Sequence, residues 1–453
     1  MNQKVIFSHH TPLIQYTMRN SLMLLLLLSF HFLSAQNYSL QIESLLKKEQ
    51  STNLDCYKNL HAHPELSTKE FNTAAYLRKT ILSYGYEIID SLGYQSFAAV
   101  LKNGNGPTIL YRTEMDGLPV KEETSLPYAS TVVSIKENEP FSVMHACGHD
   151  VHMTTWLGIA KVLSQFKNNW KGTLVMLAQS AEETAQGAKK LITSPNFNLI
   201  PQPTYQLAIH NNGDLKAGEV GFCDGYAMAA VDMINITIYG KGGHGAAPQN
   251  AIDPIVLSAQ YINEIQTIVS RNLSPNDPAI VTVGAIHGGT AGNIIPNQVI
   301  LKLTIRSYSK EARETIINRL KEIGDNLAAA AGLSKDKFPL YEILDMSIPS
   351  LYNNAELGKK IKNIIEHKFG AVVIKQVKPV MLGEDFGVYG QQLSNIPSYL
   401  LWMGTLNPEI KNTDHPVIYS PHSSHFAPFA EECIPRNISI ISNCLIELFK
   451  SVN

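Results

Sequence analysis

Gly172-Thr-Leu-Val-Met-Leu-Ala178 is an apolar run that leads directly into Gln179-Ser-Ala-Glu-Glu-Thr184. The run has the length and composition of a strand buried on both faces, as in a parallel sheet. Functional groups in such sheets gather at the carboxyl ends of the strands. Glu182 and Glu183 therefore stand where one carboxylate can bind a metal ion while its neighbour accepts a proton.

Upstream of this strand, Met144-His-Ala-Cys-Gly-His-Asp-Val-His-Met153 holds three histidines and one cysteine. It is the densest group of metal-ligating side chains in the sequence. Thiolate and imidazole suit zinc or another transition metal, and they suit calcium or magnesium poorly. Cys147 and His149 are separated only by Gly148, so both can face one point on a turn. Together with the carboxylate pair, this stretch predicts a metallohydrolase.

Strands and helices alternate around these two stretches, which is typical of an α/β layer with a mostly parallel sheet. Asn37 or Ser39 is expected to cap the first helix, and Gly85 to end the second. We predict helices at 40–60, 68–84, 153–166, 354–369 and 436–450, and strands at 96–101, 108–112, 172–178, 206–209 and 398–403.

The pattern changes between residues 226 and 345. The expected order there is strand 231–239, helix 253–271, strands 279–286 and 299–306, helix 310–331 and strand 339–344. This is the split βαβ order of a ferredoxin-like domain. Because the α/β pattern resumes afterwards, we expect a catalytic domain in two parts, 36–225 and 346–453, interrupted by an inserted domain at 226–345.

Residues 1–35 are expected to be a signal peptide. An apolar run from Leu22 to Leu33 precedes Ser34-Ala35. The run is too short to span a bilayer, and a small residue suits signal peptidase. Cleavage near Ala35 would deliver the protein to the periplasm or outside the cell, with no membrane contact afterwards. A retained short anchor, and a start at Met18 instead of Met1, are the alternatives.

The composition is that of a globular protein with a substantial core, with 44% hydrophobic and 17% charged residues in 453. Two or three domains are expected for this length. The net charge of −2 gives no indication of a nucleic-acid partner. The five cysteines are scattered and suggest no dense disulfide framework, so Cys147 is interpreted as a ligand and the others as thiols.

Several separated motifs agree with one known family. The chain resembles the dinuclear-metal amidohydrolases related to aminoacylases and carboxypeptidases, and among them the hippurate hydrolases and plant auxin-conjugate hydrolases. The matching blocks are Leu60-His-Ala-His-Pro-Glu-Leu66, Arg112-Thr-Glu-Met-Asp-Gly-Leu-Pro119, His145-Ala-Cys-Gly-His-Asp-Val-His152, Gln179-Ser-Ala-Glu-Glu183, Gly240-Lys-Gly-Gly-His-Gly-Ala-Ala-Pro248, Gly288-Gly-Thr-Ala-Gly-Asn-Ile-Ile-Pro296, Gly383-Glu-Asp-Phe386 and His422-Ser-Ser-His-Phe426.

The resemblance implies two divalent metal ions per subunit, zinc or manganese, with nickel or cobalt as further candidates. It implies Glu182 as the general base. The implied ligands are Cys147, His149, Glu183, His210 and His422.

Other residues compete for these roles. His425 competes with His422 for the last ligand position, and His210 has the alternative of an ordinary core histidine. His145 and His152 are expected to lie beside the site. Asp116 and Asp150 are expected to orient histidines, since ligating imidazoles usually need such a partner.

The resemblance also assigns a role to the inserted domain. His244 and Asn293 would reach the tetrahedral oxygen or the carboxylate of the substrate, and Arg306 would assist. The inserted domain would act as a lid and form a homodimer, with His244 serving the site of the second subunit. The chain departs from the branch at two positions, where Glu114 replaces a common aspartate and Gln249 a common histidine.

These implications predict an enzyme that cleaves the amide bond of small N-acyl-amino acids to a carboxylic acid and an amino acid. A dipeptidase or carboxypeptidase on the same scaffold, acting on short peptides, is the alternative. From another class, the chain could be an inactive metal- or ligand-binding protein. The intact pair Glu182 and Glu183 disfavours that interpretation, because an inactive copy has no need of the base.

Overall fold

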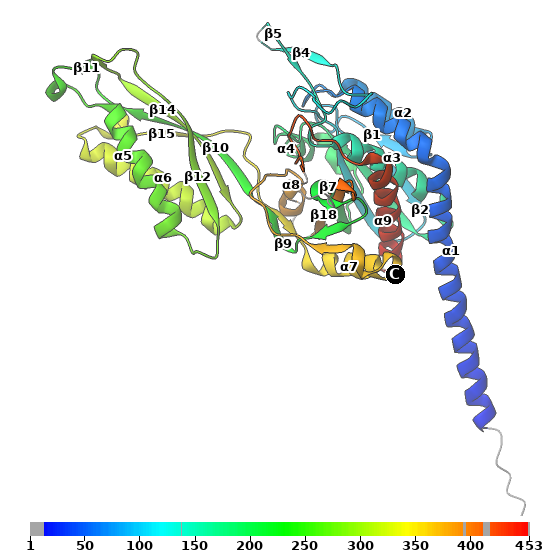
Figure 1. Ribbon diagram of the computed structural model, residues 1–453. Helices are drawn as coiled ribbons and strands as arrows, with labels where there is room; N and C mark the ends of the chain where they lie inside the picture. Colours follow the sequence, from blue (N-terminus) through cyan, green and yellow to red (C-terminus); the bar gives the residue numbers. More distant parts are fainter. Residues whose placement is uncertain (1–12, 137, 393–395, 411–416, 452–453) are drawn as a thin grey trace, which may run out of the picture.

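The computed structural model describes residues 13–136, 138–392, 396–410 and 417–451, with side chains from residue 38 onward. Figure 1 shows a large α/β body and a second unit with its own sheet and two helices. Residues 226–345, expected as an insertion, make up most of that second unit. The exact domain boundaries remain a prediction.

The body is built on an eight-stranded sheet. Its strands are, in order across the sheet, β1 (Glu87–Ile89), β2 (Phe97–Asn103), β6 (Gly172–Gln179), β3 (Thr108–Glu114), β7 (Tyr205–Lys216), β18 (Ser398–Leu406), β8 (Val220–Phe222) and β17 (Ile374–Gln376). The central strands β6, β3, β7 and β18 pair in parallel. The mostly parallel sheet predicted from the sequence is therefore confirmed.

The sheet is buried on both faces, which explains the continuous apolar run that marks β6. Leu174 and Met176 of β6 belong to one core cluster, whereas Val175 and Leu177 belong to another on the opposite face. The first face is covered by α1 (Leu13–Ala62), α2 (Phe71–Leu82), α3 (His149–Gln165), α7 (Ala355–Phe369) and α9 (Ala430–Lys450). The second is covered by α4 (Gly187–Ile192) and α8 (Gly387–Gln392).

The second unit contains a four-stranded antiparallel sheet with the order β12 (Ala279–His287), β14 (Gln298–Ser307), β10 (Ala230–Tyr239), β15 (Leu340–Ile343). The helices α5 (Pro254–Thr267) and α6 (Lys310–Ala330) share its hydrophobic core. The order along the chain confirms the predicted ferredoxin-like arrangement. We call this unit the lid.

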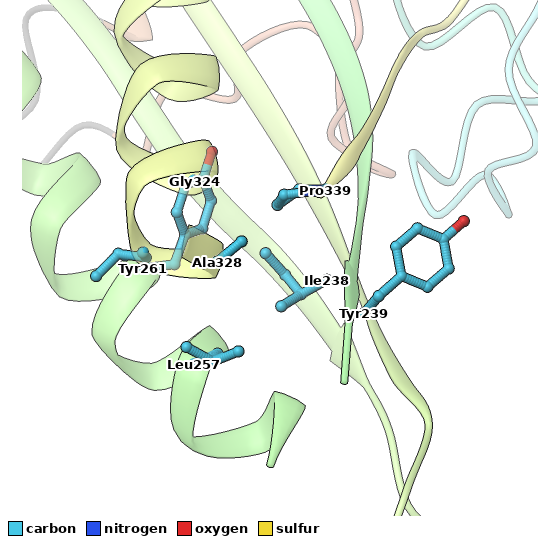
Figure 2. A pocket seen from close by; sticks show the side chains of 8 residues that line it. Ile238, Tyr239, Leu257, Tyr261, Gly324, Ala328 and Pro339 are labelled. Carbon is cyan, nitrogen blue, oxygen red and sulfur yellow. The ribbon is translucent and has the colours of Figure 1, made fainter. Parts of the chain in front are cut away.

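Figure 2 shows a small pocket in the core of the lid, between α5, α6 and β10. Its volume of about 10 Å³ would hold about one water molecule. A Cβ atom on Gly324 would lie 2.1 Å from the hydroxyl of Tyr341, so α6 approaches its neighbours closely only with glycine there. We interpret this pocket as a packing feature of the lid.

The remaining strands form three small pairs. They are β4 (Val133–Lys136) with β5 (Glu139–Ser142), β9 (Gly225–Met228) with β16 (Leu351–Asn353), and β11 (Gly243–His244) with β13 (Ile294–Ile295). None of these short strands was expected from the sequence, because two to four residues are too few for an alternating pattern to be recognised.

Three helix starts differ from the sequence prediction. The first helix is continuous from Leu13, so Asn37 and Ser39 are interior residues, consistent with the high helix propensity of the leucine-rich run before them. Helix α3 begins at His149, and α9 continues N-terminal to Pro435 instead of starting at Arg436.

In the described part of the chain, no helix is long and apolar enough to cross a bilayer. Residues 1–12 of the expected signal peptide lie outside the described residues.

Candidate metal centre

Five side chains from distant parts of the sequence meet at the carboxyl end of the central strands. Cys147 Sγ lies 3.4 Å from His210 Nε2, and His149 Nε2 lies 3.8 Å from Glu183 Oε1. His422 Nε2 lies 3.4 Å from Glu183 Oε2. The structure thus brings together all five ligands implied by the sequence.

The ligands fall into two groups that share one sulfur. The potential ligand atoms of Cys147, His149 and His210 all lie within 4.8 Å of one another, and so do those of Cys147, Glu183 and His422. Two cations could therefore be held side by side, with Cys147 between them. This is the arrangement that a dinuclear centre requires.

Local backbone geometry places Cys147 and His149. Gly148 has φ 77°, and a Cβ there would lie 2.2 Å from the amide nitrogen of Asn211. That amide donates to the carbonyl oxygens of Cys147 at 3.3 Å and Gly148 at 2.8 Å. Only glycine fits both the left-handed conformation and the close approach. The turn then enters α3, whose first residue is His149.

Each buried ligand histidine has one ring nitrogen engaged and the other directed into the site. His149 Nδ1 lies 2.8 Å from the carbonyl oxygen of Asp116, which fixes the ring as expected for a ligating imidazole. His210 Nδ1 lies 2.9 Å from the carbonyl oxygen of Asn211. The Nε2 atoms of both rings remain available at the centre.

The side-chain atoms that meet at this centre are better placed to bind metal ions than to form hydrogen bonds with one another. His149 Nε2 and Glu183 Oε1 are buried, and neither has a hydrogen-bond partner among the described residues. Leaving a buried polar atom unpaired costs about 1–3 kcal/mol. Burial, and then the carboxylates of Glu183 and Glu182, raise the pKa of the Cys147 thiol well above its usual value. A bound cation would satisfy the unpaired atoms and favour the thiolate.

Glu182 lies beside this cluster and points to a second group of acids. Its carboxylate is close to those of Glu384 and Asp385, with ligand atoms within 4.8 Å. Burial, and then repulsion from Glu384 and Glu183, raise the pKa of Glu182 well above its usual value. Burial raises the pKa of Glu384 to about 7 despite the neighbouring Arg112.

Arg112 holds these acids together, and the sequence interpretation did not assign it a role. Its fully buried guanidinium donates to Glu384 Oε1 at 2.9 Å and to Asp385 Oδ1 at 2.7 Å. It also donates to Gln179 Oε1 at 3.0 Å and pairs with Glu114. The signal was present in the motifs around Arg112 and Glu384, but only the fold brings these two motifs together.

His152 and His425 have other partners, and among the described residues His145 belongs to no ligand group. His152 uses both ring nitrogens, since Nδ1 bonds Glu114 Oε2 at 3.0 Å and Nε2 accepts from the backbone N–H of Asn211 at 3.0 Å. Burial lowers the pKa of His145 to about 4, and no ligand group of the described residues includes it. His425 stacks on Tyr419 with ring centroids 4.9 Å apart. The geometry therefore favours His422 over His425.

Of the two aspartates expected to orient histidines, only Asp116 contacts a ligand. Asp150 Oδ2 instead lies 2.6 Å from His61 Nδ1, and Glu122 Oε1 lies 2.9 Å from His61 Nε2. Asp150 therefore orients His61 of α1. Its link to the centre is that it follows His149 in the first turn of α3.

The three substrate-binding residues expected in the lid divide into two places. His244 and Asn293 are exposed neighbours, with the N–H of Gly245 donating to the carbonyl oxygen of Asn293 at 2.8 Å. Figure 1 places β11, the strand that contains His244, at the end of the lid that points away from the eight-stranded sheet. Arg306 lies at the opposite end, where its Nη1 would be 3.5 Å from a Cβ on Gly383. Of these three residues, Arg306 is the one that lies next to Gly383, which directly precedes the buried acids Glu384 and Asp385.

Comparisons with known proteins find similar sequences and structures. The model of peptidase family M20/M25/M40 matches residues 110–446. An N-acetylcysteine deacetylase of Bacillus subtilis is 34% identical over 354 residues, covering 78% of this chain and 88% of the relative. An N-acetyldiaminopimelate deacetylase of Limosilactobacillus reuteri is 33% identical over 393 residues, covering 86% and 96%. The solved structure of a dinuclear metal binding peptidase of the M20 family from Bacillus subtilis is similar, with a TM-score of 0.72, 27% identity, and coverage of 90% and 100%.

Proposed function

Because the chain belongs to peptidase family M20/M25/M40, we propose that it is a metal-dependent amidohydrolase that cleaves N-acyl-amino acids. The products would be a carboxylic acid and a free amino acid. Two relatives that match most of the chain are deacetylases of N-acetylated amino acids, which bears out the amide-hydrolase prediction and supports this substrate class.

One observation carries the proposal most strongly. His149 Nε2 and Glu183 Oε1 are buried and 3.8 Å apart, and neither has a hydrogen-bond partner within the described part of the chain. They lie in a cluster that also contains the predicted base, Glu182. A purely structural histidine and carboxylate at this distance would be expected to move together and form a hydrogen bond. Their separation fits two ligands that face a common cation.

Divalent ions held by Cys147, His149 and His210 on one side, and by Cys147, Glu183 and His422 on the other, would polarise the scissile carbonyl and make the attacking water more acidic. The protein supplies the proton acceptor. Glu182 has no ligand role in this arrangement, so its carboxylate is available to take a proton from water and deliver it to the leaving nitrogen. Such a base contributes roughly 10²–10⁴-fold to the rate.

Arg112 stabilises the neighbouring acids on which this role of Glu182 depends. Without its positive charge, Glu384 and Asp385 would face Glu182 with no buried counter-charge. The guanidinium contacts one oxygen of each acid, so it fixes their orientation as well as their charge. The part of the site next to Glu182 is thereby kept rigid before substrate binds.

Completion of the site by a second copy of the chain is a further part of the proposal. His244 and Asn293 lie at the far tip of the lid, yet their donors are suited to the oxyanion that forms during hydrolysis. His244 Nδ1 accepts from the N–H of Ala246 at 3.0 Å, which leaves Nε2 free to contact a substrate. We therefore propose a homodimer in which each lid serves the other catalytic domain.

The finer assignments rest on the sequence motifs. We propose that the chain belongs to the branch of hippurate hydrolases and auxin-conjugate hydrolases, and that the ions are zinc or manganese. We also propose export after cleavage near Ala35, and domain boundaries at 225/226 and 345/346. A dipeptidase or carboxypeptidase is disfavoured because Cys147 stands at the shared ligand position.

A substrate panel tests the proposal. The purified protein would be stripped of metal, reloaded with zinc or manganese, and assayed on N-acetyl-, N-benzoyl- and fatty-acyl-amino acids beside unblocked dipeptides. We expect metal-dependent release of the free amino acid from the N-acyl substrates, and little cleavage of the unblocked dipeptides. Faster cleavage of dipeptides would favour the peptidase alternative. Metal binding without turnover of any substrate would favour an inactive binding protein.

A further inference from the structure

The motif Leu60–Leu66 supplies no residue to the metal centre. The segment that directly follows it, from Ser67 to Glu70, contacts residues beside that centre. After Leu66, the chain turns through Thr68, whose φ of 70° is rare for a residue other than glycine. Glu70 follows at the N-terminus of α2 and is fully buried. A buried carboxylate needs compensating donors. The backbone N–H of Thr68 donates to Glu70 Oε1 at 3.1 Å, and the other donors come from a distant part of the chain.

The donors to Glu70 belong to the turn that carries the catalytic carboxylates. Its Oε1 accepts from the backbone N–H of Ala181 at 2.8 Å, and its other oxygen bonds the hydroxyl of Ser180. Ala181 has φ 59° and Ala185 has φ 56°, so residues in left-handed conformations stand on both sides of Glu182 and Glu183. Such a turn is maintained only when its surroundings hold it.

A second contact from the same segment holds the other carboxylate. Ser67 Oγ donates to Asp116 Oδ2 at 2.6 Å, and the same oxygen accepts from the backbone N–H of Glu183 at 2.9 Å. The segment therefore reaches both residues of the pair, through Glu70 at Ala181 and through Asp116 at Glu183. The hydrogen bond from the N–H of Glu183 to Asp116 does not involve Glu70.

We propose that Glu70 is a positioning residue, which fixes the turn at Ala181 so that the carboxylate of Glu182 faces the substrate. It acts through the backbone and touches neither substrate nor metal. Removing it should allow Ala181 to relax toward an ordinary conformation and rotate Glu182 out of line. Glu183 should keep its place because Asp116 still holds its N–H. This inference rests on the proposed role of Glu182 as the base.

Glu70→Ala is the test, and Glu65→Ala is its matched control. Glu65 lies in the same segment and binds the start of the same helix, where it accepts from the backbone N–H groups of Asn72 at 3.2 Å and Thr73 at 2.8 Å. Among the described residues its carboxylate makes no hydrogen bond with the catalytic turn, so Glu65→Ala should lower the melting temperature and leave kcat within about twofold. Glu70→Ala should lower kcat roughly 10- to 100-fold, the range expected for a small misplacement. Its KM and metal content should be unchanged, and Glu70→Gln should retain most activity because its amide oxygen can still accept from Ala181.

A double-mutant cycle separates positioning from general damage. If Glu70 acts through Glu182, then adding Glu70→Ala to Glu182→Gln should lower kcat no further. An equal loss in both backgrounds, a loss that follows metal content, or a loss no greater than that of Glu65→Ala would overturn the proposal. If Glu70→Ala does not fold, Ser180→Ala gives the same comparison with one contact removed. Full activity of Glu182→Gln alone would instead contradict the base assignment, whatever the result at Glu70.

Discussion

Cys147 is the residue on which both ligand groups converge. Its sulfur lies near His210 on one side and belongs to the group of Glu183 and His422 on the other. The surrounding burial and negative charge disfavour a thiolate unless cations are present. A thiol at this position is therefore useful only in a protein that binds metal, and its removal should affect both ions together.

Cys147→Ala is expected to lose both metal ions and essentially all activity. Metal content measured by mass spectrometry on the purified variant, together with turnover, checks this. Cys444→Ala is the control, because Cys444 is also a buried free thiol but lies in α9, within the hydrophobic core. Full metal content in Cys147→Ala would show that the sulfur is not a ligand.

The individual residues of the site show how much of it could be predicted from the sequence. The ligand types and the pair Glu182 and Glu183 were recognisable because metal chemistry restricts which side chains can serve. Arg112 could not be recognised in the same way, since its partners at 384 and 385 are distant in the sequence and meet it only across the sheet. His145 and His152 have the side-chain type of a ligand, so the sequence alone does not distinguish them from His149. The distinction comes from the fold, which engages both ring nitrogens of His152 and leaves His145 outside the ligand groups of the described residues.

At the scale of elements, strands were predicted well where they are long and buried, and helix starts were predicted poorly. Helix α3 was expected to begin at Met153. In the fold, Gly148 instead forms the N-cap in a left-handed conformation, so His149 and Asp150 lie in the first turn. The contact that requires this glycine comes from Asn211 on β7, which the local sequence does not reveal.

His61 joins three elements, and the stability of this junction should depend on pH. Its ring lies between Asp150 of α3 and Glu122 of a loop. Burial lowers the pKa of His61, but the hydrogen bonds to Asp150 and Glu122 outweigh it and raise the pKa from 6.5 to about 10. Because the folded pKa is the higher one, this stabilisation is complete below pH 6.5 and is lost as the pH rises through about 10.

The expected result is a free energy of unfolding that falls less steeply between pH 6.5 and 10 in His61→Gln than in the wild type. Denaturant titrations across this range measure it. His63→Gln is the control, since His63 is exposed and bonds only the carbonyl of Asn59 among the described contacts. Parallel pH profiles for wild type and His61→Gln would show that the junction is not charged.

On the scale of the whole molecule, the proposed oxyanion donors lie away from the metal centre of their own chain. His244 lies in β11 at the outer end of the lid (Figure 1), and the N–H of its neighbour Gly245 donates to the carbonyl oxygen of Asn293. The lid also exposes an edge strand, β12, with Ile280 and Ile286 accessible. Exposed apolar edges are natural pairing surfaces, which supports the proposed dimer.

Subunit mixing tests action across the dimer. His244→Ala and Glu182→Gln should each be nearly inactive, since removal of an oxyanion donor costs about 10²–10³-fold. A mixed dimer would contain one site with both residues intact, so activity should reappear when the two variants exchange subunits. No recovery in dimers shown to be mixed would mean that His244 does not act in trans.

Export can be tested at the N-terminus. The hydrophobic core includes α1 from Tyr38 onward, so cleavage near Ala35 would leave its packing against the sheet intact. The mature protein is expected to begin near Gln36 and to be found outside the cytoplasm. N-terminal sequencing of the mature protein that recovers residues before Ser29 would contradict this expectation.

The most direct test of the account compares the two adjacent carboxylates. Glu182→Gln should keep both metal ions while kcat falls by roughly 10²-fold or more, as loss of a general base requires. Glu183→Gln should instead lose metal, because its oxygens lie nearest His149 and His422. Metal stoichiometry and kcat measured on both variants decide the matter. If Glu182→Gln loses metal while Glu183→Gln retains it, the assignment of base and ligand is contradicted.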